Sequence, residues 1–216
     1  PIKCSPKDSN EVKSSIKQCY KGKNYNTENF SILIYEDGGK NLVQFLSIDN
    51  FRELKSQGQE VKEILINFLK SLTNLIDGLL FFKTKNIVHR DIKAENIVYN
   101  FITKKIKYID FGLMIEKETA IHNSTDNIDR GKYTEVVRYD PWPPEFRCTT
   151  QNKWNSNSCN MYRHRENGEK LDWSEFIELA IDVFDLYSLS KVFYKIGLII
   201  QEPNFLSLFD DPFLSI

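Results

Sequence analysis

Apolar residues recur along this 216-residue chain with two different periods, which predict helices in some segments and short strands in others. Over Gln59–Phe82 they fall at spacings of three and four residues, which predicts one long amphipathic helix. A second helix is predicted over Glu175–Ile196, where apolar residues lie almost all round, so we expect it to be buried. Asp172 and Glu175 stand at capping-box positions at its start. A short helix is also predicted over Asn41–Ser47.

Short runs of β-branched and aromatic residues predict strands on both sides of a charged loop. Ile87–Val88 and Ile97–Tyr99 flank the segment His89–Asn96, which we call the HRD loop. Ile106–Ile109 predicts a further strand that forms a hairpin with Ile97–Tyr99. Phe30–Tyr35 is nearly all apolar and predicts a buried strand. Because a half-buried surface does not tolerate charges without a purpose, the HRD loop is predicted to be a functional site.

Composition restricts the class of protein more than its chemistry. Apolar residues make up 41% of the chain and aromatic residues 13%, which are values typical of a globular domain. The net charge of −1 gives no reason to propose a nucleic acid or a membrane surface as a partner. Lys195 and Gly197 interrupt the apolar run Val192–Ile200, and no signal-peptide layout is present. We therefore expect no nucleic-acid and no membrane partner.

The cysteines are scattered without C-x-x-C pairs, which favours free thiols in a reducing compartment over a disulfide framework or a zinc site. Cys148, Cys159 and His164 share one polar segment, but their spacing matches no common metal-binding pattern. We therefore expect a cytoplasmic protein. The cysteines are Cys4, Cys19, Cys148 and Cys159.

The charged residues of the HRD loop have a specific spacing. His89-Arg90-Asp91 is followed by Lys93 and Asn96, and Asp110-Phe111-Gly112, which we call the DFG segment, comes after the predicted hairpin. Either motif alone would more often be structural, as a surface ion-pair cluster or a turn after a strand. Together, in this order and at this distance, they resemble the H-R-D-x-K-x-x-N loop and the D-F-G of protein kinases.

The resemblance implies a role for each matched residue. Asp91 would orient the substrate hydroxyl and accept its proton, and Lys93 would neutralise charge on the transferred γ-phosphate of ATP. Asn96 and Asp110 would hold Mg²⁺, because amide and carboxylate oxygens suit a hard cation. Arg90 would anchor a folded activation segment. The remaining residues, His89, Phe111 and Gly112, would have structural roles, in which His89 and Phe111 pack together and align the two motifs.

The predicted strand Phe30–Tyr35 ends where a kinase has its hinge, the segment whose backbone hydrogen-bonds adenine. By this resemblance the nucleotide-binding hinge is Tyr35, Glu36, Asp37 and Gly38. The residues alone are equally compatible with any strand that ends in a Gly-Gly turn. Their position relative to the HRD loop favours the hinge.

After the DFG segment, residues 112–145 are predicted to form a polar, loop-like activation segment. Its end resembles the A-P-E motif, with Pro143-Pro144-Glu145 in its place. Arg138 falls near a position where many serine/threonine kinases carry threonine. Asp185–Ser190 resembles the D-x-W-S-x-G of the central kinase helix, and Asp185 would bind the backbone of the HRD loop. Conceivable phosphorylation sites are Ser124, Thr125, Tyr133 and Thr134.

The expected fold class is therefore α+β, a protein-kinase-like fold that is mainly the helical large lobe with a remnant of the small β lobe. Residues 1–37 would supply partial small-lobe strands and the hinge, and residues 38–216 the large lobe, with an insertion or extended loop at 147–171. No glycine-rich phosphate loop and no small-lobe lysine precede the hinge. We expect both ends of the domain to be missing or rebuilt.

The function implied by this resemblance is a divergent protein serine/threonine kinase, similar to those of large DNA viruses, that uses ATP and Mg²⁺. Its partners would be a protein substrate and an activating or scaffolding protein, in the cytoplasm of a host cell or in a virion. An alternative is a catalytically weak or inactive pseudokinase that serves as a scaffold. A small-molecule phosphotransferase of kinase-like fold is less favoured, because Arg90, Lys93 and the Phe-Gly after Asp110 resemble protein kinases.

Overall fold

The computed structural model describes residues 2–3, 31–32, 36–125, 142–148, 155, 157–164 and 167–209. The chain divides into two compact units, residues 1–37 and 38–216. In the first unit, β1 (Ile2–Lys3) pairs antiparallel with β2 (Ser31–Ile32), which lies within the predicted strand 30–35. All other described helices and strands belong to the second unit.

The strands of the second unit form two small antiparallel sheets. The predicted hairpin is confirmed as β5 (Ile97–Asn100) paired with β6 (Lys105–Tyr108), and β3 (Lys40–Asn41) adds to the other edge of β5. The second sheet joins β4 (Ile87–Val88) to β7 (Ile115–Glu116). Because β4 leads into the HRD loop and β7 follows the DFG segment, this pairing brings the two motifs together.

The predicted short helix before the HRD loop corresponds to α2 (Leu42–Phe45). Its N-cap is Asn41, whose side chain accepts the Gln44 backbone N–H at 2.9 Å, while the Gln44 side chain accepts the Asn41 N–H. This reciprocal capping box satisfies backbone donors that a helix start leaves without partners. A further helix, α3 (Ile48–Ser56), was not predicted.

The prediction of one continuous helix over 59–82 was wrong, because the structure has α4 (Val61–Ser71) and α5 (Thr73–Thr84) with a break at Leu72. The hydroxyls of Ser71 and Thr73 donate to carbonyl oxygens three residues earlier, at 2.6 and 3.0 Å. Such bonds compete with the regular helix ladder for backbone carbonyls. A hydrophobic pattern does not register this competition, because it runs unbroken through the interruption.

The helix predicted over 175–196 is longer in the structure, as α9 (Trp173–Gln201), and the capping box at its start is confirmed. Asp172 accepts the Glu175 backbone N–H at 2.8 Å, and Glu175 accepts the Asp172 N–H at 3.2 Å. The expectation of burial all round was wrong, since only one face of α9 is buried among the described residues. The large apolar residues exposed along it are Leu179, Val183, Leu186, Tyr194 and Leu198.

The segment after the DFG motif is more regular than predicted. In place of a loop, α6 (Lys117–Thr125) follows β7, and its Lys117 ammonium pairs with Asp182 of α9 at 2.7 Å. The 3-10 helix η4 (Pro144–Cys148) contains Glu145. The activation-segment residues Tyr133, Thr134 and Arg138 lie outside the described residues.

The predicted loop over 147–171 contains the 3-10 helix η5 (Asn157–Tyr162) and an isolated bridge between His164 and Lys170. A disulfide joins Cys148 of η4 to Cys159 of η5, and both residues are buried. The prediction of free thiols was therefore wrong for this pair. Spacing could not reveal it, because the two residues lie on different helical turns that the fold brings side by side. Cys4 and Cys19 lie outside the described residues.

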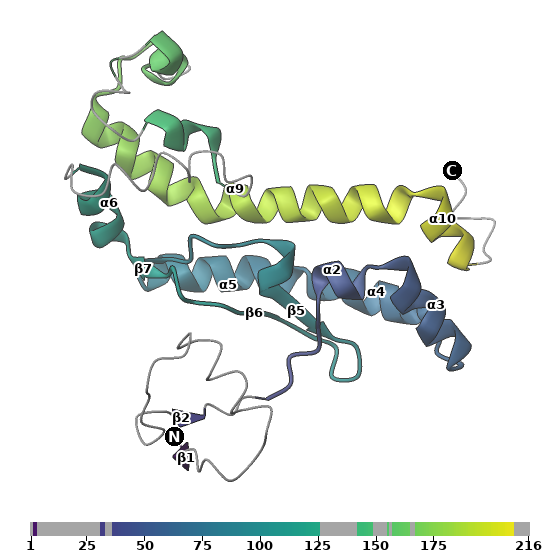
Figure 1. The fold of residues 1–216 in the computed structure, drawn as a ribbon. Helices are drawn as coiled ribbons and strands as arrows, with labels where there is room; N and C mark the ends of the chain where they lie inside the picture. Colours follow the sequence, from purple (N-terminus) through teal and green to yellow (C-terminus); the bar gives the residue numbers. More distant parts are fainter. Residues whose placement is uncertain are drawn as a thin grey trace, which may run out of the picture. The chain divides into compact units, whose positions relative to one another are not determined.

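Two hydrophobic clusters support the HRD loop from opposite ends of α9, which runs alongside α5 (Figure 1). The larger cluster contains residues of the helices α2, α3, α4 and α5, of the strand β5 and of the C-terminal half of α9. Residues of α10 (Pro203–Leu206) and η6 (Ser207–Phe209) also belong to it. The smaller cluster joins β4, α6, the disulfide and the N-terminal half of α9. Aromatic rings dominate the larger cluster, among them Phe45, Phe51, Phe68, Tyr99 and Phe205.

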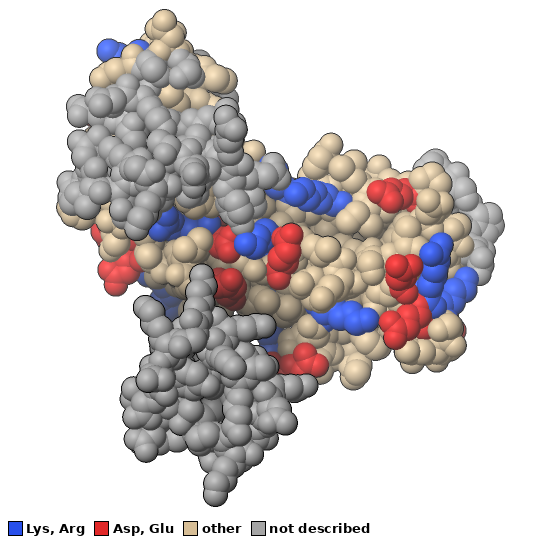
Figure 2. All heavy atoms as spheres, in the orientation of Figure 1, with Lys and Arg blue, Asp and Glu red and all other residues tan. Residues whose placement is uncertain are grey.

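Charged side chains of both signs lie on the described surface (Figure 2). On the face shown in Figure 2, the described basic and acidic side chains are interspersed. One stretch, Val61–Thr84, is long and apolar enough to cross a membrane by length and composition, which the sequence analysis did not anticipate. This is weak evidence for a membrane span, because Phe68 and Leu75 of the same stretch belong to the core and Leu72 interrupts the helix.

Candidate active site

The HRD loop is fixed to α9 through its backbone. The Asp185 carboxylate accepts the backbone N–H groups of His89 and Arg90, at 2.7 and 2.9 Å. Asp185 is buried, and burial raises the pKa of its carboxyl, while the two N–H donors act in the opposite direction. This contact is the one that resemblance to the central kinase helix implies for Asp185.

Arg90 adopts a left-handed backbone conformation, with φ of 67°. For a residue with a Cβ atom this conformation costs about 1–2 kcal/mol, so neighbouring contacts must hold it in place. The N–H side of the residue is held by Asp185. The result is a sharp turn of the chain directly before Asp91.

Asp91 lies at the centre of a hydrogen-bonded group of polar side chains. Its carboxylate accepts the Lys93 ammonium at 3.0 and 3.1 Å and the Asn96 amide at 2.7 Å, and the same amide also binds the Asp91 carbonyl at 3.0 Å. Asp91 and Asn96 are buried, while the Lys93 side chain remains 28% exposed. The 3-10 turn η2 (Ala94–Asn96) makes these contacts possible by folding Asn96 back toward Asp91.

His89 supports the loop in its neutral form. Its Nδ1 atom accepts the Asp91 backbone N–H at 3.3 Å, and its ring lies 5.3 Å from that of Phe111. Burial lowers the pKa of His89 below its ordinary value near 6.5, whereas the Asp185 carboxylate acts to raise it. A neutral imidazole can accept at Nδ1, while a charged one cannot. The fold therefore favours the form that this hydrogen bond requires.

We expect His89 to make the fold sensitive to acid. A base whose pKa is lowered by folding contributes stability above its unfolded pKa near 6.5, and this contribution is lost as the pH falls below that value. The free energy of unfolding, measured with denaturant at pH 7.5, 6.5 and 5.5, should therefore fall more steeply in the wild type than in His89→Asn. Asn keeps an acceptor near the Asp91 N–H but does not titrate. Parallel pH profiles for the two proteins would contradict this assignment.

A backbone hydrogen bond connects the HRD loop to the DFG segment, since the Ile109 N–H donates to the Asn96 carbonyl at 2.9 Å. The next residue, Asp110, also has a left-handed backbone, with φ of 61°, and its exposed side chain accepts the Gly112 N–H at 3.3 Å. The two motifs thus meet at Asn96, one predicted metal ligand, and at Ile109, the residue before the other predicted ligand, Asp110.

The residues present fit a magnesium ion. The Asn96 amide nitrogen is committed to Asp91, which leaves the amide oxygen as the atom available to a cation. The Asp110 carboxylate is exposed and supplies a second hard oxygen donor. No group of three or more His, Cys, Asp or Glu side chains in the described part of the chain could hold a metal.

The predicted hinge is only partly described. Tyr35 lies outside the described residues, and Glu36, Asp37 and Gly38 have no regular secondary structure. Gly38 approaches β5 closely, because a Cβ atom placed on it would lie 2.6 Å from a methyl group of Val98. The assignment of these residues to adenine binding stays a prediction.

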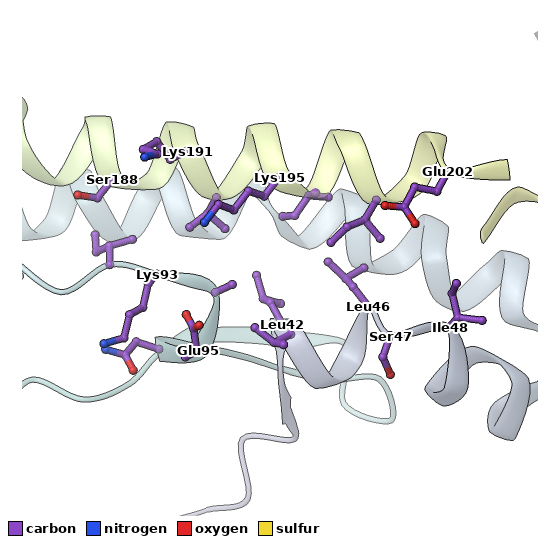
Figure 3. Close-up of a pocket in the computed structure, with 17 residues that line it drawn as sticks. Leu42, Leu46, Ser47, Ile48, Lys93, Glu95, Ser188, Lys191, Lys195 and Glu202 are labelled. Carbon is purple, nitrogen blue, oxygen red and sulfur yellow. The ribbon is translucent and has the colours of Figure 1, made fainter. Parts of the chain in front are cut away.

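A groove of about 900 Å³ begins at the HRD loop and runs between α2 and α9 (Figure 3). Its walls are mainly apolar, and Lys93 and Glu95 line the end that belongs to the HRD loop. Ser188, Lys195 and Glu202 line it from α9 or the turn that follows. Lys93 and Asn96, the two residues that hold the Asp91 carboxylate, both form part of the groove wall.

Sequence reasoning missed Trp142, which lies just before η4. Its indole N–H donates to the Arg90 carbonyl at 2.9 Å. Trp142 stands between two prolines in the sequence and matches no motif weighed above. Its partner is a backbone carbonyl, which any residue supplies, so no sequence signal could have found this contact.

Comparison with known proteins matches residues 15–145, more than half of the chain, to the family described as protein kinase domain. The chain belongs to the protein kinase domain family. The match spans the HRD loop, the DFG segment and Glu145, so the motifs described above lie within it. The α+β kinase-like fold class is thereby confirmed.

Several curated kinases are similar to this kinase domain. A probable serine/threonine-protein kinase, mkcC, of Dictyostelium discoideum is 41% identical over 28% of the chain and 6% of its own length. A membrane-associated tyrosine- and threonine-specific cdc2-inhibitory kinase of Drosophila melanogaster is 26% identical over 56% of the chain and 26% of its own length.

A viral relative supports the resemblance to kinases of large DNA viruses. Serine/threonine-protein kinase 1 of Orgyia pseudotsugata multicapsid polyhedrosis virus is 25% identical over 36% of the chain and 27% of its own length. The kinase domain therefore spans less than a third of the length of these relatives. No solved structure is significantly similar to it.

Proposed function

We propose that this kinase domain is a protein serine/threonine kinase, which transfers the γ-phosphate of ATP to a hydroxyl group of a protein. The observation that carries the proposal is the environment of Asp91. Its buried carboxylate is held by Lys93 and Asn96, and these two residues also line the groove of Figure 3. A carboxylate oriented in this way can receive a proton from a hydroxyl group that a polypeptide in the groove presents.

In the proposed reaction, the hydroxyl oxygen of the substrate bonds to the γ-phosphorus, and the bond from that phosphorus to the bridging oxygen of ADP breaks. Asp91 orients the hydroxyl group and accepts its proton. Lys93, which pairs with Asp91 in this structure, would turn toward the γ-phosphate and balance its charge. A magnesium ion held by Asn96 and Asp110 would supply bridging of the phosphates and further charge neutralisation.

Two observations support a protein hydroxyl as the acceptor. Lys93 stands two residues after Asp91, a placement that resembles the serine/threonine branch of the family. The groove of about 900 Å³, with apolar walls from α2 and α9, is where we propose that part of a polypeptide binds. Curated relatives with serine/threonine-protein kinase in their names agree with this acceptor class. We propose a protein as the substrate and an activating or scaffolding protein as a further partner.

The test is a phosphotransfer assay on the full chain. Incubation with Mg²⁺, ATP labelled in the γ-phosphate and a mixture of casein and histone should give label on serine or threonine of a protein. Label on phosphotyrosine alone, or on a small molecule in place of protein, would contradict the proposed acceptor. Nucleotide binding without any transfer would favour a pseudokinase scaffold, the alternative suggested by the lack of a glycine-rich loop motif in residues 1–35.

A further inference from the structure

The two backbone polar groups of Arg90, its N–H and its carbonyl, are held by different parts of the chain. On one side, the Asp185 carboxylate accepts the Arg90 N–H. On the other side, the Arg90 carbonyl accepts the indole N–H of Trp142 at 2.9 Å. The carbonyl belongs to the peptide group whose nitrogen is that of Asp91. The Trp142 contact therefore acts one bond away from the residue that carries the proposed proton acceptor.

Trp142 also contacts the side chain of Arg90, whose guanidinium carbon lies 5.7 Å from the centre of the indole ring. This is a favourable cation–π distance. The tryptophan thus contacts both the backbone and the side chain of a residue whose left-handed conformation needs external support.

The position of Trp142 is itself fixed by packing against α9. Its ring lies 5.2 Å from Phe184 and 5.8 Å from Phe146, and the last two rings are 4.5 Å apart, all in edge-to-face arrangements. Phe184 directly precedes Asp185 in α9. The two groups that hold the Arg90 backbone therefore rest on adjacent residues of one helix, which makes them a single rigid support.

We propose that Trp142 is a positioning residue for catalysis: through its indole N–H it fixes the peptide before Asp91 and thereby the direction of the Asp91 carboxylate. This inference rests on the proposed kinase function. It links the segment that precedes Pro143-Pro144-Glu145 to the reaction by a direct contact, in addition to its packing.

Trp142→Phe tests the proposal, because phenylalanine keeps an aromatic ring beside Phe184 and removes only the N–H donor. Loss of one hydrogen bond of ordinary strength should lower kcat for phosphotransfer about three- to tenfold. The KM for ATP should be unchanged, because the hydrogen bond that is removed goes to the Arg90 carbonyl and not to a proposed magnesium ligand. Replacement of the indole nitrogen by sulfur, as in 3-benzothienylalanine, should reproduce the loss with the ring shape retained.

Trp173→Phe is a matched control, since the Trp173 indole nitrogen is buried and has no hydrogen-bond partner in the described structure. It should leave kcat at the wild-type value. A wild-type kcat in Trp142→Phe would overturn the proposal. Equal losses of kcat in both variants would also overturn it, because they would indicate a purely structural role.

Hydrogen exchange separates failure of this proposal from failure of the proposed function. Backbone amides of the peptide that covers residues 88–93 should exchange faster in Trp142→Phe than in the wild type, and at the wild-type rate in Trp173→Phe. This result requires no activity, so it supports the positioning contact even if the wild type transfers no phosphate. Unchanged exchange in Trp142→Phe would overturn the contact, whatever the activity.

Discussion

Asp91→Asn should reduce phosphotransfer by a factor of about 10² to 10⁴, the usual contribution of a positioned general base. An asparagine has nearly the same shape and its amide oxygen can still accept from Lys93 and Asn96. It has no carboxylate to receive the substrate proton. Steady-state rates with labelled ATP, measured beside melting temperatures, would separate this chemical loss from unfolding.

The nucleotide should still bind to Asp91→Asn, because the proposed contacts to magnesium come from Asn96 and Asp110. Asp49→Asn is a suitable control, since this carboxylate on α3 is 94% exposed and lies 3.4 Å from the Arg52 side chain, on another element than the HRD loop. It should keep the wild-type rate. If Asp91→Asn transferred phosphate as fast as the wild type, Asp91 would not be the proton acceptor.

Asp185→Ala should destabilise the domain by roughly 3 kcal/mol or more, because one buried and one partly buried N–H donor lose a charged acceptor that is worth about 1.5–3 kcal/mol for each bond. The left-handed turn at Arg90 would also lose support on its N–H side. For a domain of this size, we expect the melting temperature to fall by about 6–12 °C. Chemical denaturation followed by circular dichroism measures the free energy of unfolding, and thermal unfolding measures the melting temperature.

Glu178→Ala provides the comparison on the same helix. Glu178 is exposed and pairs with Lys117 at 3.5 Å, so its removal should cost no more than about 1 kcal/mol. For a domain of this size, a change of 1 kcal/mol in stability shifts the melting temperature by about 2–4 °C. If the melting temperatures of Asp185→Ala and Glu178→Ala differed by less than about 2 °C, Asp185 would not be an anchor of the HRD loop.

The parts of the fold that depend on local pattern could be predicted from the sequence. The hairpin of β5 and β6 and the capping box at Asp172 were both expected, because alternation and capping residues act over a few positions. The break at Leu72 and the α6 helix were missed. In each case hydrogen bonds or packing against α9 decide the outcome, and neither appears in a hydrophobic pattern.

The site shows the same division. The resemblance singled out Asp91, Lys93 and Asn96, and a short loop brings these side chains together, whereas the roles that it implies for them stay predictions. The disulfide between Cys148 and Cys159 and the contact of Trp142 with Arg90 could not be predicted. Both join segments whose proximity depends on the folded position of η4, and the Trp142 contact uses a backbone carbonyl that carries no sequence signature.

The exposed apolar residues on one face of α9 show that composition alone overestimates how much of a helix is buried. A helix that is apolar all round was expected to be buried, yet Leu186 is 57% exposed and Tyr194 67% exposed. Apolar composition states what a helix can bury, whereas the neighbouring elements determine what it does bury.

The most direct test of a nucleotide site in this domain is thermal unfolding with and without Mg-ATP, in the wild type and in Asp110→Asn. A ligand that binds only the folded state at a hundred times its Kd adds about 2.7 kcal/mol, or roughly 5–11 °C here. The account predicts a rise in melting temperature that requires Mg²⁺, is lost in Asp110→Asn and is retained in Asp77→Asn, which changes an exposed carboxylate of α5. No rise in the wild type at millimolar Mg-ATP, or an equal rise in Asp110→Asn, would contradict it.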